Sequence, residues 1–330
     1  MLRLMTMLNS NGKNRIEWID TAKGYGIIFV FLGHIGFGRF GNWIYSFHLP
    51  LFFFLSGYVF KSGLGVTDFI KKKARSMLLP YILLALLFFP FDDTLYNVKL
   101  YLIQQRFGAV WFIATLLVLE IIFYILTRAF KKDIYLIIST AVLTGIWIAV
   151  KDVHLPWNAD AALFASPFFC AGFLSRKYNL SGAVETRKTL ICGISLVISI
   201  ILAFLNVKIS GETLDIYIYR YGCIPVMYLA AFAGIAFVTS LSMIKPLPPL
   251  EYIGCNSLIY YGIHMPYPMN MALGILAAFG LSNSGTGIRV LLIKALLFVL
   301  LLIITTVAVY IWNLLKSAVY GFICRNRRKS

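Results

Sequence analysis

Two histidines stand inside consecutive apolar runs near the start of the chain. His34 closes the apolar part of residues 15–34, and His48 lies within residues 45–58, where polar groups are scarce. Ionisable side chains at membrane depth cost free energy, so they are candidates for a functional site. A neutral imidazole there could take a proton from a hydroxyl as a general base, or it could be a structural histidine hydrogen-bonded between helices.

Lys23 precedes His34 by eleven residues, which is about 1100° of helical rotation and therefore nearly the same face of a helix. Along the axis the two residues are about 16 Å apart, roughly half of a hydrocarbon core, so they cannot touch. A ligand that contacts both must be long and must run along the membrane normal. Alternatively, Lys23 is an interfacial lysine, or it forms an ion pair with Asp20 three residues away.

Further polar residues occur in the apolar runs. Glu120 lies in the middle of one run, so its carboxylate should face the interior of a helix bundle. His48 could face His34 across a tight hairpin, or it could lie at the membrane interface. It could also pair with Ser56 as base and nucleophile, although the chain has no Gly-x-Ser-x-Gly elbow.

Arg75 enters an apolar run just after the lysines at 71–73. A guanidinium can hold phosphate oxygens in a bidentate way, so Arg75 is a candidate for binding a phosphate. The lysine run has the same functional interpretation, but it is also typical of contact with anionic lipid or of topology signals. Trp111 and Phe112 could form a ring wall for a ligand, or they could belong to an aromatic belt at the membrane interface.

The elements that must position these residues are membrane helices. The chain of 330 residues is 60% hydrophobic and 13% charged, whereas soluble domains are about 45–50% apolar and about 25% charged. We therefore expect an all-α polytopic membrane protein, a bundle of about ten transmembrane helices. The ten apolar segments are approximately 22–38, 42–60, 76–91, 109–127, 134–150, 159–174, 189–206, 223–244, 258–279 and 289–314.

Lysines and arginines are distributed unevenly among the connecting loops. The segments that share a side with both termini carry 21 of them, and the loops on the opposite side carry 7. Positively charged loops stay in the cytosol, so we expect both termini there. This asymmetry accounts for the net charge of +17, and no nucleic-acid partner is expected. The five cysteines form no CxxC pair, and neither a disulfide framework nor a metal site is expected.

The loops leave no room for an extramembrane domain, so any chemistry takes place within the bundle or at its mouths. We expect one domain over residues 1–330, surrounded by membrane lipid. It comprises a cytosolic N-terminal segment at 1–21, a membrane bundle at 22–314 and a basic cytosolic tail at 315–330.

Two sequence patterns surround the histidines. Ile-Asp-x-x-Lys-Gly is followed by Gly-His within residues 19–34, and Phe-His-x-Pro-Leu-Phe-Phe-Phe-Leu-Ser-Gly-Tyr occupies residues 47–58. This combination resembles the membrane-bound acyltransferase family 3. Further matches are Arg75 with Pro80 and Tyr81, Trp111 with Phe112, and the run 256–264 that ends in His264.

The resemblance implies an O-acyltransferase of the inner membrane of a bacterium. Such an enzyme would move an acetyl group from cytosolic acetyl-CoA to a hydroxyl of a cell-surface glycan or a lipid-linked sugar. His34 would be the general base, with His48 as a second catalytic residue; an acyl-histidine intermediate is the alternative. The rival from another class is a transporter or flippase of a glycolipid or small solute. Transporters often contain internal repeats, and we find none here.

Two further groups of residues follow from the same resemblance. Residues that would bind the acyl-CoA donor are Lys23, Arg75 and Asp20. Candidates for the acceptor site or pocket are Trp111, Glu120 and His264.

Overall fold

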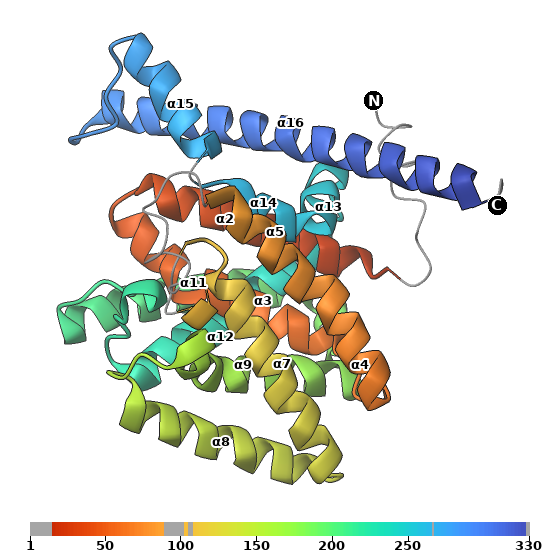
Figure 1. The fold of residues 1–330 in the computed structure, drawn as a ribbon. Helices are drawn as coiled ribbons and strands as arrows, with labels where there is room; N and C mark the ends of the chain where they lie inside the picture. The colour runs from red at the N-terminus through yellow and green to blue at the C-terminus, as the bar shows by residue number, and fades with distance from the viewer. Residues whose placement is uncertain (1–14, 89–101, 105–107, 266, 328–330) are drawn as a thin grey trace.

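The protein, described by a computed structural model over residues 15–88, 102–104, 108–265 and 267–327, is a bundle of α-helices (Figure 1). The helices are α2 (Glu17–Ile35), α3 (Arg39–Val59), α4 (Val66–Lys73), α5 (Leu79–Phe88), α7 (Trp111–Ala129), α8 (Asp133–Val150), α9 (Ala159–Lys177), α10 (Leu180–Thr186), α11 (Lys188–Ser210), α12 (Ile224–Ile244), α13 (Pro248–Cys255), α14 (Ser257–Ile263), α15 (Tyr267–Ala278) and α16 (Ile288–Arg327).

Short non-α segments complete the described chain. A π-helical turn at Ala74–Leu78 joins α4 to α5, and 3-10 turns occupy Pro156–Asn158 and Ile216–Ile218. In the ranges that the structure describes, β-structure is limited to an isolated bridge between Asp215 and Arg220. The prediction of an all-α protein is therefore confirmed.

Eight helices correspond to predicted spans. Five of them are long and apolar enough to cross a membrane, namely α7, α8, α11, α12 and α16. α2, α3 and α9 contain 19, 21 and 19 residues, which is also close to the length of a span. They fall outside the first group because their sequences are more polar; α2, for example, contains Asp20, Lys23 and His34.

Two of the ten predicted spans are not single, separate helices. The segment 76–91 continues, over its described part, from the basic helix α4 through the π turn into α5. The segment 258–279 is divided into α14 and α15, which end and begin on either side of His264 and Met265. Hydropathy alone did not reveal this break, because the residues on both sides of it are apolar.

The predicted basic tail at 315–330 is helical over its described part. Residues 315–327 continue α16 without interruption, so this helix contains 40 residues and is about 60 Å long. Figure 1 shows it running along one edge of the bundle, where it contacts α2, α14 and α15. Its opposite, outward face carries exposed apolar side chains, as expected for a surface that faces lipid.

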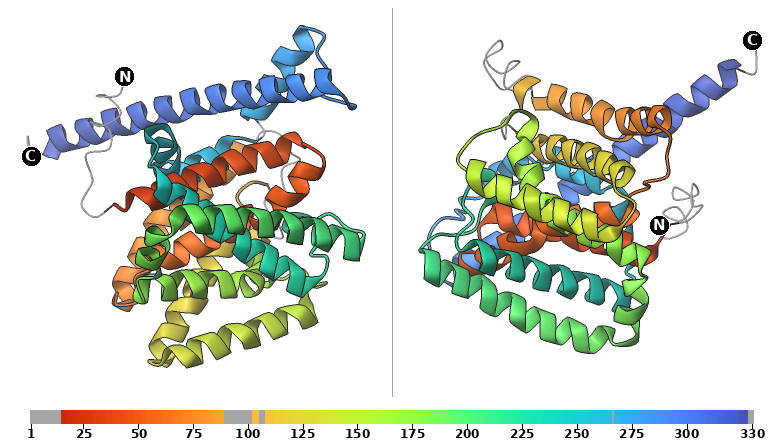
Figure 2. Two further views of the ribbon diagram at one scale, coloured as in Figure 1. Left: turned by 180° about the vertical axis from the view of Figure 1, so that it is seen from behind. Right: turned by 90° about the horizontal axis from the view of Figure 1, so that it is seen from below.

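α3 lies at the centre of the bundle, in contact with α2, α9, α11 and α12 (Figure 2). Glycines allow α3 and α9 to approach closely. A Cβ atom added to Gly57 would lie 2.0 Å from the carbonyl oxygen of Phe169, and one added to Gly172 would lie 2.0 Å from that of Phe54. Neither neighbour is a flexible side chain, so this crossing excludes any larger residue.

Candidate active site

Two cavities lie at successive depths between the same four helices, α2, α3, α7 and α14. We call the first the lysine cavity; it has a volume of about 230 Å³ and is lined by Lys23 and Lys73 among others. The second is the histidine cavity, with a volume of about 480 Å³, lined by His34, His48 and His264. The sequence predicted that Lys23 and His34 lie on one face of a helix without touching, and in the structure they line different cavities.

The histidine cavity brings together three of the four histidines in the chain. The rings of His34 and His264 lie 5.0 Å apart between centroids, tilted by 46°. His264 also stacks on Phe31 at 5.3 Å, and Tyr45 meets His48 edge to face at 5.1 Å. The sequence suggested that His48 could face His34. In the structure the ring of His34 contacts that of His264, and all three histidines line the cavity.

His34 differs from the other two histidines in its surroundings. It lies in the last turn of α2, its side chain is exposed to the cavity, and its ring makes no hydrogen bond to any described residue. The helix ends just beyond it at Gly36, whose positive φ of 78° closes α2 in the left-handed conformation that glycine favours. The Nζ atom of Lys294 on α16 donates to the Gly36 carbonyl oxygen at 2.6 Å, which fixes the end of α2 that carries His34.

The two other histidines are buried, with exposed fractions of 5% for His48 and 1% for His264. Each places Nδ1 against a backbone carbonyl, at 2.9 Å from Ile44 for His48 and at 2.6 Å from Tyr261 for His264. A carbonyl oxygen can only accept, so Nδ1 carries the hydrogen in both rings. The Nε2 atom of His264 is then a buried acceptor, and it has no partner among the described residues.

Aromatic and acidic residues complete the histidine cavity. Trp111 lines it, as do Tyr217 and Asp215 from the segment between α11 and α12. The rings of Trp111 and Tyr217 lie 5.8 Å apart. Sequence reasoning singled out Trp111 but missed Asp215 and Tyr217, because their segment lacks the helical periodicity that would indicate a shared face.

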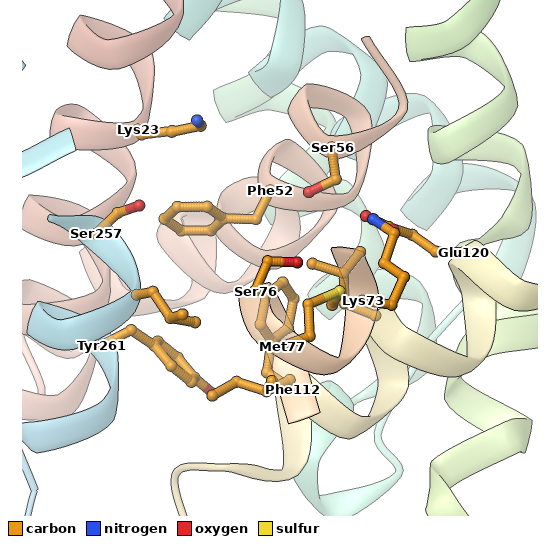
Figure 3. Close-up of a pocket in the computed structure, with 13 residues that line it drawn as sticks. Lys23, Phe52, Ser56, Lys73, Ser76, Met77, Phe112, Glu120, Ser257 and Tyr261 are labelled. Atoms are coloured by element: carbon orange, nitrogen blue, oxygen red, sulfur yellow. The ribbon is translucent and has the colours of Figure 1, made fainter. Parts of the chain in front are cut away.

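Glu120, whose partner could not be identified from the sequence, lines the lysine cavity. Glu120 is buried on α7 and forms an ion pair with Lys73, the last residue of α4 (Figure 3). The side chains of Lys73 and Glu120 are only 12% and 8% exposed. The prediction that Glu120 faces the interior therefore agrees with its position, but it lines the lysine cavity and not the histidine cavity.

Lys23 projects from α2 into the lysine cavity, and its ammonium group forms an ion pair with the Asp20 carboxylate. The Nζ atom of Lys23 lies 3.8 Å from Asp20, and the Nε atom of Arg15 lies 4.0 Å from the same carboxylate. The thiol of Cys255 on α13 donates to Asp20 at 3.4 Å and accepts from Arg15 at 2.8 Å. Burial raises the pKa of this thiol to about 11, and the Asp20 carboxylate adds to that rise.

Two further predicted residues are Arg75 and Ser56. Arg75 is exposed on the π turn and does not line the lysine cavity, whereas Ser76 and Met77 beside it do. Ser56 lines the lysine cavity while His48 lines the histidine cavity, so the structure does not bring them together as a nucleophile and base. In the part of the chain that the structure describes, no group of three or more histidine, cysteine or acidic side chains is arranged to hold a metal ion.

Comparisons with known proteins identify the family of the chain. A stretch of 185 residues is 29% identical to nodulation protein NolL of Mesorhizobium japonicum and covers 49% of this chain and 48% of that protein. The chain thus aligns with about half the length of this curated relative. No solved structure gives a significant match. The model of the acyltransferase domain of family 3 matches residues 16–315, which include both cavities and every element from α2 to most of α16. Because this match extends over most of the 330 residues, the chain belongs to acyltransferase family 3.

Proposed function

We propose that this protein is a membrane acyltransferase that transfers an acetyl group from acetyl-CoA to a hydroxyl of a cell-surface glycan or a lipid-linked sugar, with His34 as the general base. The proposal rests on the exposure and the hydrogen bonding of the His34 side chain. Of the three histidines in the cavity, it alone is exposed and has both ring nitrogens free of hydrogen bonds to described residues. A base needs a free nitrogen within reach of the hydroxyl from which it takes the proton.

The lysine cavity is suited to the acyl-CoA donor. Its cations, Lys23 and Lys73, attract phosphate, although each is already paired with a carboxylate. A cavity of about 230 Å³ suits the thin thioester-bearing arm of the donor, while its phosphates stay at the mouth. Arg75 is exposed beside Ser76, a lining residue, and is therefore available there for a phosphate contact.

The histidine cavity is suited to the acceptor. It is larger, at about 480 Å³, and combines the aromatic rings of Trp111 and Tyr217 with the carboxylate of Asp215. Rings of this kind pack against the apolar faces of a sugar, and a carboxylate accepts hydrogen bonds from its hydroxyls. His34 takes the proton of one acceptor hydroxyl, and the hydroxyl oxygen attacks the carbonyl carbon of the thioester. The C–S bond then breaks, and the departing sulfur takes the proton from His34, so that coenzyme A leaves as the thiol.

The experiment is a transfer assay on the purified protein in lipid nanodiscs, with acetyl-CoA and extracted lipid-linked sugars. We expect release of the coenzyme A thiol together with a new O-acetyl ester, detected by mass spectrometry. A transporter or flippase would move the sugar without consuming thioester, so absence of thiol release in the presence of the native acceptor would exclude the proposal. Comparison of surface glycans from cells with and without the protein identifies that acceptor.

Donor binding is tested separately with Arg75→Ala. We expect weaker coenzyme A binding by calorimetry, and only partial recovery in Arg75→Lys because a lysine lacks the bidentate fork. Lys71→Ala removes an equally exposed cation from α4 and serves as the matched control. Equal affinities of the parent and Arg75→Ala would move the phosphate site to other residues.

A further inference from the structure

Among the residues that the structure describes, Tyr261 on α14 is the one that lines both the lysine cavity and the histidine cavity. α4 and the π turn line only the lysine cavity, whereas α2, α3, α7 and α14 line both cavities with residues at two depths. On α2 these are Lys23 and His34, and on α3 they are Ser56 and His48. The two cavities therefore lie one after the other along these four helices, with Tyr261 at the level between them.

Three aromatic rings fill this level of the bundle. Phe52 from α3, Phe112 from α7 and Tyr261 from α14 all line the lysine cavity (Figure 3). Their ring centroids lie 6.0 Å apart for Phe52 and Phe112, and 5.4 Å apart for Phe112 and Tyr261. Each ring is less than 10% exposed. The neighbouring rings along this row are therefore in contact with one another.

α2 closes the remaining side of this level through a glycine. A Cβ atom added to Gly26 would lie 2.7 Å from the Cζ atom of Phe52, so the ring of Phe52 packs directly on the backbone of α2. Gly26 lies between Lys23, which lines one cavity, and Val30, which lines the other. All four helices thus contribute to the closed level.

We propose that Phe52, Phe112 and Tyr261 form an aromatic barrier that separates the lysine cavity from the histidine cavity, and that Tyr261 is its movable part. Polar cavities that joined through a membrane would conduct water and ions, and a layer of packed, dewetted rings prevents this. Tyr261 is the movable part because it alone faces both cavities. It also lies on α14, which has seven residues, whereas α3 and α7 have 21 and 19.

The barrier gives Tyr261 a role in transfer, a step that rests on the proposed function. An acetyl group carried into the lysine cavity reaches His34 only if the Tyr261 ring rotates away. The ring centroid of Tyr261 lies 5.8 Å from that of His264. The backbone carbonyl oxygen of Tyr261 accepts a hydrogen bond from His264 Nδ1. Rotation of the side chain leaves the backbone contact to His264 in place, so the histidines stay arranged while the path opens.

The experiment measures which side of the membrane can reach each cavity. The full chain, with its five native cysteines replaced, carries either Ser56→Cys in the lysine cavity or Ala109→Cys in the histidine cavity. A membrane-impermeant thiol reagent is applied to intact cells and to inverted vesicles. In the parent we expect each introduced thiol to react from one side only, and from opposite sides for the two positions.

Adding Tyr261→Ala should make both thiols reactive from both sides, and Tyr261→Phe should keep the one-sided pattern because the ring remains. Tyr260→Ala is the matched control: the same side chain is lost from the neighbouring position, but Tyr260 lines neither cavity and bonds to Thr306 on α16. Thermal stability in detergent verifies that each variant is folded, and Phe112→Ala is the second barrier variant.

One-sided labelling that persists in both Tyr261→Ala and Phe112→Ala would overturn the barrier. Two-sided labelling of the parent would overturn it as well. These readouts need no donor or acceptor, so they do not depend on transfer. Failure of the transfer assay with an intact labelling pattern would reject the proposed reaction and keep the barrier.

Discussion

The imidazole rings of His34 and His264 lie 5.0 Å apart, although one ends α2 and the other follows α14. His34 is exposed and has no hydrogen bond to a described residue, whereas His264 is buried and bonded through Nδ1. The His34 ring can therefore rotate and accept a proton. The His264 ring is held in place, and its Nε2 atom is an acceptor with no partner among the described residues. We infer that His34 exchanges the proton and that His264 holds the acceptor hydroxyl in position.

His34→Ala should reduce turnover by about 10²- to 10⁴-fold, the usual contribution of a positioned general base. Donor affinity should be unchanged, because the cations of the lysine cavity do not touch His34. Turnover and coenzyme A binding are measured on purified protein whose thermal stability matches that of the parent. Near-parental turnover of His34→Ala would end the general-base mechanism.

His264→Phe keeps a ring that can stack on Phe31 but removes the acceptor nitrogen. Loss of one hydrogen bond of about 0.5–1.5 kcal/mol corresponds to a rise in the acceptor KM of roughly 2- to 10-fold. The change in kcat should be much smaller than in His34→Ala. Steady-state kinetics with varied acceptor measures both constants, and a kcat loss as large as that of His34→Ala would make His264 a second base.

Breaking the ion pair of Lys73 and Glu120 should destabilise the protein strongly. Both side chains are nearly buried, at 12% and 8% exposed, so Glu120→Gln leaves an unpaired ammonium group. Such losses cost about 3–5 kcal/mol. We expect a lower Tm in detergent for Glu120→Gln and for Lys73→Met. Replacing both residues, by Lys73→Met with Glu120→Leu, removes the uncompensated charge and should recover most of the stability; additive losses would indicate that the pair is not coupled.

The main features of this site follow from helical periodicity and from the cost of charge in lipid. Eleven residues place Lys23 and His34 on one face of α2 at different depths, and they line successive cavities. The same cost indicates that Glu120 faces inward. These arguments concern one helix at a time. They therefore predict the face of the helix on which a residue lies, but not the side chains of other helices that it contacts.

Contacts between helices could not be predicted in this way. The partner of Glu120 is Lys73 because the π turn carries α4 directly into α5, and a lysine run gives no indication of which member turns inward. His264 reaches His34 because the apolar segment 258–279 is broken at that point. Asp215 joins the site from an irregular segment, where sequence periodicity is absent.

The orientation of the bundle in the membrane is a separate prediction. The 21-to-7 asymmetry of lysines and arginines predicts that both termini lie in the cytosol. Reporter fusions after Asp133 and after Lys188 should therefore report a cytosolic location, and a fusion after Asn158 should report the outside. The reverse pattern would place the lysine cavity on the outer side, away from cytosolic acetyl-CoA, and would remove the basis of the donor assignment.

Alkylation of Cys255 should be slow at neutral pH and should accelerate as the pH rises toward 11. The thiolate is the reactive form, and burial, with the Asp20 carboxylate as the next cause, raises the pKa of this thiol to about 11. At pH 8 only roughly one thiol in a thousand is then ionised. Asp20→Asn removes a negative charge that opposes the thiolate, so it lowers the pKa and increases the rate at pH 8.

Arg15→Ala should have the opposite effect, because the guanidinium favours the thiolate and lowers the pKa. Mass spectrometry after timed treatment with iodoacetamide, from pH 7 to pH 11, gives the rate at Cys255 separately from the other cysteines. If Cys255 of the parent protein already reacted at pH 8 as fast as in an unfolded chain, its thiol would be neither buried nor hydrogen-bonded to Asp20. The arrangement that also anchors Lys23 through this carboxylate would then be wrong.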